Sequence, residues 1–145
     1  LNRLELRICD LISDPISLLA ITALLEARLI QLIENPLLDP LQMSQLSAEE
    51  LVELSDANEV EAARSSLDAE LRHWQTGAPI LARDWIAQLY DEVWAIAKRE
   101  GFSCFLLPVR KILREGNEAQ KWLALQSQGL DQQTILKGAI ADLHQ

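Results

Sequence analysis

The chain is poor in the residue types that build metal sites and disulfide frameworks, since its 145 residues include two cysteines and two histidines. Neither Cys9 nor Cys104 belongs to a Cys-x-x-Cys pair or has a nearby histidine, so we interpret both as reduced packing residues of a cytoplasmic protein. His73 and His144 lie far apart in sequence, without ligating residues at useful spacing. We therefore assign neither histidine to metal binding or catalysis.

Positive charge is also scarce. The chain carries 13 Lys and Arg against 22 Asp and Glu, which gives a formal net charge of −9 and a sequence pI near 4.6. No cluster of Lys and Arg forms a basic stripe along the sequence. We therefore expect no nucleic-acid partner and no binding to an anionic membrane surface.

The apolar runs are shorter than a membrane span requires. The most apolar stretch, residues 16–25, ends at Glu26 and Arg28 and falls short of the ~20 residues of a transmembrane helix. No basic segment followed by an apolar core and a small-residue cleavage site indicates a secretory signal. We therefore expect a core helix at this position and no membrane partner.

An alternating pattern near the N-terminus is the most informative feature present. Charged and apolar residues alternate with a period of two, which predicts a β-strand over residues 3–9 with one buried face. The charged positions are Arg3, Glu5 and Arg7, and the apolar positions are Leu4, Leu6 and Ile8. A carboxylate beside guanidinium groups can hold a divalent cation and grip phosphate or carboxylate oxygens, which suits ATP chemistry. The alternative is the solvated face of a half-buried strand.

This run resembles the Glu-x-Arg strand of glutamate–cysteine ligases of the carboxylate–amine ligase type. Residues 14–26 are similar to the strand-to-helix continuation of that family, and residues 114–120 are similar to a segment near its C-terminal end. Residues 57–69 resemble a further family segment, whose pattern is carried by Asn58, Arg64, Leu67 and Asp68. Val60 and Ser65-Ser66 stand where the family pattern has a tryptophan and a glycine, so a related ligase that uses another amine stays an alternative.

The resemblance implies an ATP-dependent enzyme that joins the γ-carboxyl of glutamate to the amine of cysteine through an acyl phosphate. It implies ATP and Mg²⁺ as cofactors, with Glu5 holding Mg²⁺ and Arg7 contacting the transferring phosphoryl group or the glutamate. Arg3 and Arg64 are the substrate-binding candidates of second rank. The expected partners are glutamate, cysteine and the remaining N-terminal part of the enzyme, and a homo-oligomer is left open.

The resemblance also implies a fold, namely the helical C-terminal portion of an α+β ligase similar to glutamine synthetase. We expect residues 1–145 to form a single, mainly α domain, with one N-terminal strand over 3–9 followed by a helical region over 14–143. Such a portion would be catalytically incomplete alone. The competing hypothesis is a non-enzymatic helical interaction module, which the acidic charge and the missing catalytic half favour.

Capping signals and apolar periodicity predict the helices. Asp14 and Pro15 begin a helix that ends before Pro36 and is expected to be buried on most sides. A loop over 37–45 follows, and Ser47 and Glu50 then form a capping box at the start of a second helical region. That region is expected to break near residues 55–56 and to resume through residue 64.

The second half of the chain is predicted to begin with an extended segment over 68–74 and a turn over 75–79. A long helix over 82–99 and three shorter ones over 106–114, 118–126 and 132–142 should follow. We interpret Gly116-Asn117 as a helix end and turn. The four tryptophans are expected to be core or interface anchors, not a nucleobase platform: Trp74, Trp85, Trp94 and Trp122.

Overall fold

The computed structural model describes residue 12 and residues 14–142, and the strand predicted over 3–9 lies outside these residues. The described part is mainly α-helical, as predicted. Its helices are α1 (Pro15–Glu34), α2 (Pro40–Met43), α3 (Ala48–Ser65), α4 (Ala82–Arg99), α5 (Ser103–Glu115), α6 (Glu118–Ser127) and α7 (Gln132–Asp142). Two short 3₁₀ turns, η1 (Pro36–Leu38) and η2 (Ser66–Asp68), and two strands, β1 (Glu70–Arg72) and β2 (Pro79–Leu81), complete it.

Helix α1 begins where its capping signal predicts. The Asp14 carboxylate accepts hydrogen bonds from the backbone N–H groups of Ile16 and Ser17, at 3.1 and 3.0 Å, and Pro15 occupies the first turn. The Ser17 hydroxyl also donates to this carboxylate and is the main reason that the pKa of Asp14 lies below its ordinary value of 3.8. Asn35 caps the other end of α1, so the predicted bounds are confirmed.

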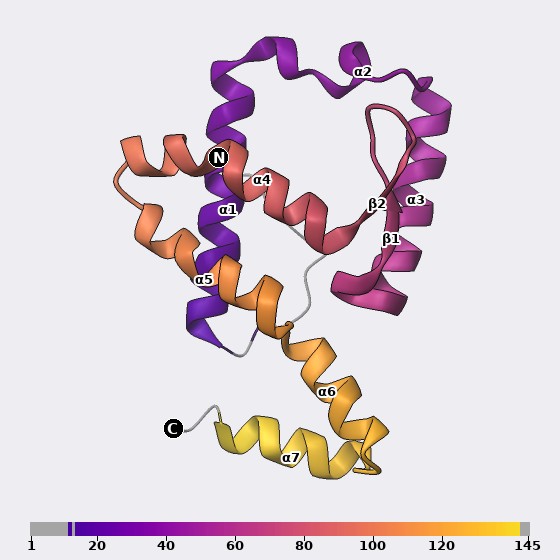
Figure 1. Ribbon diagram of the computed structural model, residues 1–145, viewed down its shortest axis with the longest axis vertical. Coiled ribbons are helices and arrows are strands. Elements are labelled where there is room, and N and C mark those ends of the chain that lie inside the picture. The colour runs from indigo at the N-terminus through magenta and orange to yellow at the C-terminus, as the bar shows by residue number, and fades with distance from the viewer. Residues whose placement is uncertain (1–11, 13, 143–145) are drawn as a thin grey trace, which may run out of the picture.

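The core lies between α1, α4 and α5, which cross one another in the body of the molecule (Figure 1). Helix α1 contributes small residues to it, because Ala20, Ala23 and Ala27 are fully or almost fully buried. Small side chains let helix axes approach closely, and larger side chains from the facing helices then fill the space. The largest fully buried side chains are Tyr90, Val93 and Leu106.

Much of the surface of α1 is not covered by the described residues, so the prediction that this helix is buried on most sides is wrong for this part of the chain. Ile16 and Ile33 expose 61% and 77% of their surface, and Leu18 and Leu19 are also exposed. The sequence pattern was misleading because a helix that is apolar on all sides indicates that it has packing partners, but does not show which segments those partners are.

By length and composition alone, α1 could also cross a membrane, because its apolar character continues past Glu26 and Arg28.

Helix α3 starts at the predicted capping box, in which Glu50 N–H donates to Ser47 Oγ and the Ser47 N–H donates to the Glu50 carboxylate. The predicted break near residues 55–56 is wrong, since the helix is continuous through Ser65. Ser and Asp cost only about half a kcal/mol each inside a helix. Burial of Leu54 and the contacts of Asn58 outweigh that cost.

The extended segment predicted after α3 is confirmed as strand β1, which pairs antiparallel with β2. The Asn58 side chain clamps the end of β1, because its amide donates to the Arg72 carbonyl and its oxygen accepts from the Arg72 N–H, both at 2.8 Å. Gly77 has φ +71° in the connecting turn, a conformation that favours glycine. Helix α3 and this hairpin lie on one side of the three-helix core (Figure 1).

The C-terminal helices follow the predicted order. Helix α5 ends at Gly116, which has φ +90°, and Asn117 then caps α6, so Gly116-Asn117 is a helix end and turn as predicted. Figure 1 shows α6 leading away from the three-helix core and α7 turning back below it. The predicted loop over 37–45 is partly wrong, because it contains η1 and the single turn α2.

Candidate functional site

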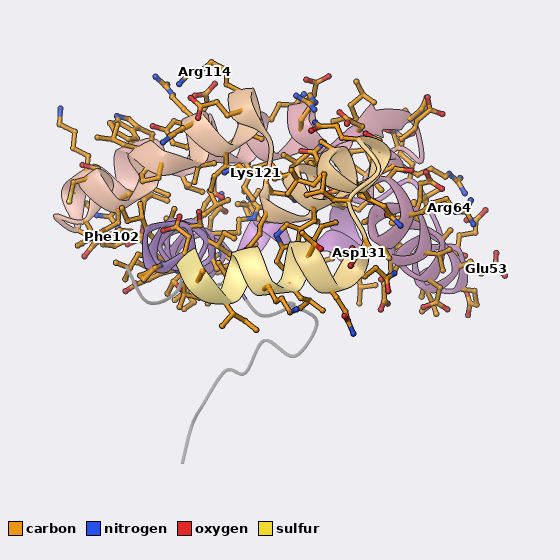
Figure 2. The ribbon with its side chains drawn as sticks, turned by 90° about the horizontal axis from the view of Figure 1, so that it is seen from below. Glu53, Arg64, Phe102, Arg114, Lys121 and Asp131 are labelled. Atoms are coloured by element: carbon orange, nitrogen blue, oxygen red, sulfur yellow. The ribbon has the colours of Figure 1, made fainter. Side chains whose placement is uncertain are left out.

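The predicted site residues fall into two groups. Arg3, Glu5 and Arg7 lie outside the described residues, so their roles stay predictions. Arg64 lies in the last turn of α3, where 73% of its side-chain surface is exposed and Nη1 is 3.6 Å from the Glu61 carboxylate. Figure 2 places Arg64 at the outer surface of α3. An exposed pair of this kind contributes about 0–1 kcal/mol, which leaves the guanidinium available to a ligand.

Two segments that carry the family resemblance, residues 57–69 and 114–120, come together in the fold. Asn117 Nδ2 donates to Ser66 Oγ at 2.7 Å, and Gln120 Nε2 donates to the Asp68 carboxylate at 2.7 Å. These contacts join residues about fifty positions apart in sequence. Tertiary structure therefore connects the C-terminal end of α3 with the first turn of α6.

Arg83 of α4 extends this junction. Its guanidinium forms an ion pair with Asp68 and donates from Nη1 to the Leu113 carbonyl at 3.0 Å. The two carboxylate oxygens of Asp68 thus accept hydrogen bonds, one from Arg83 and one from Gln120. Because charge-assisted hydrogen bonds are stronger than neutral ones, Asp68 is the residue that fixes η2 against α4 and α6.

The backbone of Ser66 is strained at the junction. Its φ of 54° and ψ of −129° lie in a region that residues other than glycine rarely adopt. Such a conformation costs about 1–3 kcal/mol and persists only where surrounding contacts hold it. Here the Ser66 N–H donates to the Ala62 carbonyl while its hydroxyl accepts from Asn117.

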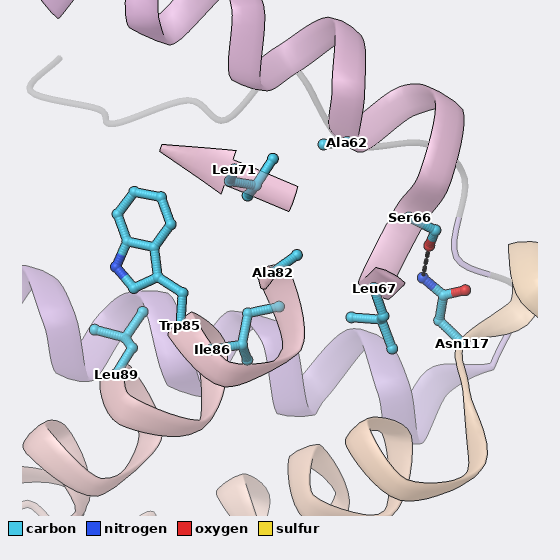
Figure 3. A pocket seen from close by; sticks show the side chains of 9 residues that line it. All are labelled: Ala62, Ser66, Leu67, Leu71, Ala82, Trp85, Ile86, Leu89 and Asn117. Atoms are coloured by element: carbon cyan, nitrogen blue, oxygen red, sulfur yellow. Dashed lines mark hydrogen bonds between the residues drawn. The ribbon is translucent and has the colours of Figure 1, made fainter. Parts of the chain in front are cut away.

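An apolar pocket of about 350 Å³ adjoins this junction (Figure 3). Most of its lining is aliphatic or aromatic, and the hydrogen-bonded pair Ser66 and Asn117 supplies the polar side. The lining residues are Ala62, Ser66, Leu67, Leu71, Ala82, Trp85, Ile86, Leu89 and Asn117. Trp85 is half-buried, and its ring lies 5.0 Å from that of His73, between ring centroids. The lining suits a small apolar or planar group.

The described residues contain no cluster of metal-ligating side chains. Among residue 12 and residues 14–142, no group of three or more His, Cys, Asp or Glu side chains could hold a metal ion. Mg²⁺ is commonly held by one or two carboxylates together with substrate phosphates and water. The predicted ligand Glu5 is one of the residues that the structure does not describe, so its role stays a prediction.

Asp68 and Gln120 lie within segments that resemble the family, but the sequence alone indicates no role for them. The sequence also gives no reason to select Arg83. The local signal for part of the junction is present, since Asn117 and Gln120 form a capping box in which each side chain bonds to the other residue's backbone N–H. The pairing of Asp68 with Arg83 has no local signal. Trp85 contacts the ring of His73 and lines the pocket, and Trp94 packs against the core.

Comparison with known families gives one result for the whole chain. The family model described as glutamate-cysteine ligase family 2 (GCS2) matches residues 1–145. No curated protein and no solved structure matches the chain.

Proposed function

Because this chain belongs to glutamate-cysteine ligase family 2, we propose that it forms part of an enzyme that joins the γ-carboxyl of glutamate to the amine of cysteine with ATP. The observation that carries the proposal is the family match over all 145 residues. The family supports ligase-type function in general, and it favours an enzyme over a purely structural helical module.

The proposed reaction needs ATP because a carboxylate lacks a leaving group. The γ-carboxylate oxygen attacks the γ-phosphorus of ATP, which forms an acyl phosphate and releases ADP. The cysteine amine then attacks the acyl carbon, the carbon–oxygen bond to phosphate breaks, and the amine loses a proton. The products are the γ-glutamyl amide, ADP and phosphate.

The residue roles in the proposal come from the resemblance. Arg7 stabilises negative charge on the transferring phosphoryl group, because a fixed guanidinium acts most strongly where charge develops. Arg3 and Arg64 hold carboxylate or phosphate oxygens of the substrates. Glu5 is the proposed Mg²⁺ ligand, and the bound ion would screen the negative charge of the ATP phosphates.

We further propose that the chain alone is inactive and is completed by the remaining part of a cytoplasmic enzyme. One observation supports incompleteness: large apolar side chains of α1 are exposed. Exposed apolar patches on a helix mark surfaces that interact with other protein or with a membrane, and we propose the first here. The same exposure is compatible with a homo-oligomer.

The testing experiment identifies products, because a related ligase could use another amine. Intact enzyme is incubated with ATP, glutamate and each amine of a panel that includes cysteine, and the γ-glutamyl products and ADP are quantified by mass spectrometry. We expect γ-glutamylcysteine to form fastest, with ADP in equal amount. Equal or faster product formation with another amine would reassign the substrate, and ATP-independent or absent amide formation would overturn the proposed function. The 145-residue chain alone should give no product.

A further inference from the structure

A second concave surface lies between α4 and α5. It is a shallow, open depression of about 310 Å³, lined by three residues of α4 and three of α5, and we call it the basic groove: Arg83, Asp84, Ala87, Arg110, Leu113 and Arg114. Residues 82, 85, 86 and 89 of α4 line the apolar pocket, whereas residues 83, 84 and 87 line the groove. With 100° between successive helical residues, these two sets lie on different sides of α4. The groove is therefore separate from the pocket.

Arginine is the commonest residue type in the lining of the basic groove. Three arginines and one aspartate line it, and each arginine also pairs with a carboxylate beside the groove: Arg83 with Asp68, Arg110 with Asp91 and Arg114 with Glu115. Arg110 and Arg114 expose 66% and 72% of their side chains, and they lie one helical turn apart on α5. Side chains spaced by four residues share a helix face, so both can reach the same ligand.

The ion pairs at the rim are weak enough to be exchanged. Arg110 Nη2 lies 3.6 Å from the Asp91 carboxylate, and both side chains are mostly exposed. Arg114 Nη2 lies 2.8 Å from the carboxylate of the adjacent residue Glu115, again at an exposed position. Exposed pairs contribute about 0–1 kcal/mol each, so a doubly charged ligand can compete for these guanidinium groups.

Two of the arginines are held in place before any ligand arrives. Arg83 is fixed by Asp68 and by the Leu113 carbonyl, and Arg110 lies with its guanidinium carbon 4.7 Å from the centroid of the Tyr90 ring. The second contact is a cation–π interaction with a ring that is almost completely buried. Preorganised donors reduce the entropy lost on binding.

We propose that the basic groove binds a small phosphate-type oxyanion, with one or two phosphate groups held between Arg110 and Arg114 on α5 and Arg83 on α4. Planar guanidinium groups match phosphate oxygens with paired hydrogen bonds, which a lysine cannot reproduce. A volume of about 310 Å³ accommodates a diphosphate. The site uses none of the residues proposed for catalysis, so it does not rest on the proposed function.

Calorimetric titration of the 145-residue chain with pyrophosphate at low ionic strength tests the site. The double substitution Arg110→Gln/Arg114→Gln should weaken binding at least about tenfold, because each arginine supplies a charge-assisted hydrogen bond. The matched control is Lys98→Gln/Lys137→Gln, which removes the same number of charges from exposed positions outside the groove. This control should leave affinity within about twofold, and raising the salt concentration should weaken binding of the unmodified chain.

Parallel titrations with inorganic phosphate and with ADP, without divalent cation, distinguish a free phosphate ligand from the phosphate chain of a nucleotide. Tighter binding of ADP than of pyrophosphate assigns the groove to a nucleotide, and the reverse order assigns it to inorganic oxyanions. Circular dichroism of both double variants establishes that they remain folded. Absence of saturable pyrophosphate binding at millimolar concentration, or an equal loss in the lysine control, would overturn the proposal.

Discussion

Asn117 donates a hydrogen bond to Ser66 Oγ over 2.7 Å and thereby ties the first turn of α6 to the end of α3. The same Asn117 side chain accepts from the Gln120 N–H, so one amide serves as a helix cap and as a tertiary contact. Neither role can be lost without disturbing the place where the two family segments meet.

The interaction energy between Asn117 and Ser66 should be measurable from the free energies of unfolding of their variants. Asn117→Ala should destabilise the chain by about 1–3 kcal/mol, because it removes both a cap and a tertiary hydrogen bond. A double-mutant cycle with Ser66→Ala in urea should give an interaction energy of about 0.5–1.5 kcal/mol. Ser47→Ala, which removes the cap of α3 without a tertiary contact, is the control. Strict additivity of Asn117→Ala and Ser66→Ala would contradict the tie.

Because the backbone at Ser66 is strained, replacing Ser66 with glycine and replacing it with alanine should affect stability differently, although both remove the hydroxyl. Its φ of 54° and ψ of −129° are accessible to glycine without steric cost and are strained for alanine. Ser66→Gly should therefore be more stable than Ser66→Ala by about 1–3 kcal/mol in urea unfolding. Equal stability of the two variants would show that the backbone at this position is unstrained.

The cap of α1 should make stability depend on pH. Because the folded-state pKa of Asp14 is lowered, chiefly by the Ser17 hydroxyl, its contribution is fully present above the ordinary pKa of 3.8. That contribution is lost as the pH falls below 3.8 and through the lower folded-state pKa. Asp14→Asn keeps a capping side chain without the titration, so its urea midpoint should fall less between pH 5 and pH 3. Superimposable pH profiles would refute the assignment.

Tyr90 offers a test of a buried polar group. Its ring is 2% exposed, and its hydroxyl has no hydrogen-bond partner within the part of the chain that the structure describes. Burial also raises the pKa of this phenol, which keeps it neutral. Tyr90→Phe removes an unsatisfied group, so the free energy of unfolding should stay within about 1 kcal/mol of the original or increase. A loss well beyond that value would mean that the hydroxyl has a partner in the folded chain.

Local signals in the sequence were sufficient for most of the helices. Asp14 with Pro15, and Ser47 with Glu50, placed two helix starts correctly because a cap is a contact between residues two or three positions apart. The break predicted inside α3 is absent because the burial of Leu54 outweighs the low helix propensities of Ser55 and Asp56. That burial depends on the tertiary fold and cannot be read from local sequence.

The site was less accessible to such reasoning. The ion pair between Asp68 and Arg83 and the hydrogen bond between Ser66 and Asn117 join residues fifteen and fifty-one positions apart, and no local pattern encodes such pairs. The family resemblance pointed to the two segments that meet in the fold, residues 57–69 and 114–120, but it did not predict the contacts between them. The roles of Arg3, Glu5 and Arg7 stay predictions, and Arg64 lies on the surface with Glu61 as its neighbour.

The most direct test of the ligase account measures phosphate release by the intact enzyme, dependent on both glutamate and cysteine, with and without Arg7→Ala. If Arg7 stabilises the transferring phosphoryl group, kcat should fall by about 10²–10³, as loss of a preorganised donor does. Arg7→Lys should recover only part of that loss, because an ammonium cannot make the paired contact. Near-normal turnover in Arg7→Ala, or phosphate release that ignores glutamate and cysteine, would contradict the account.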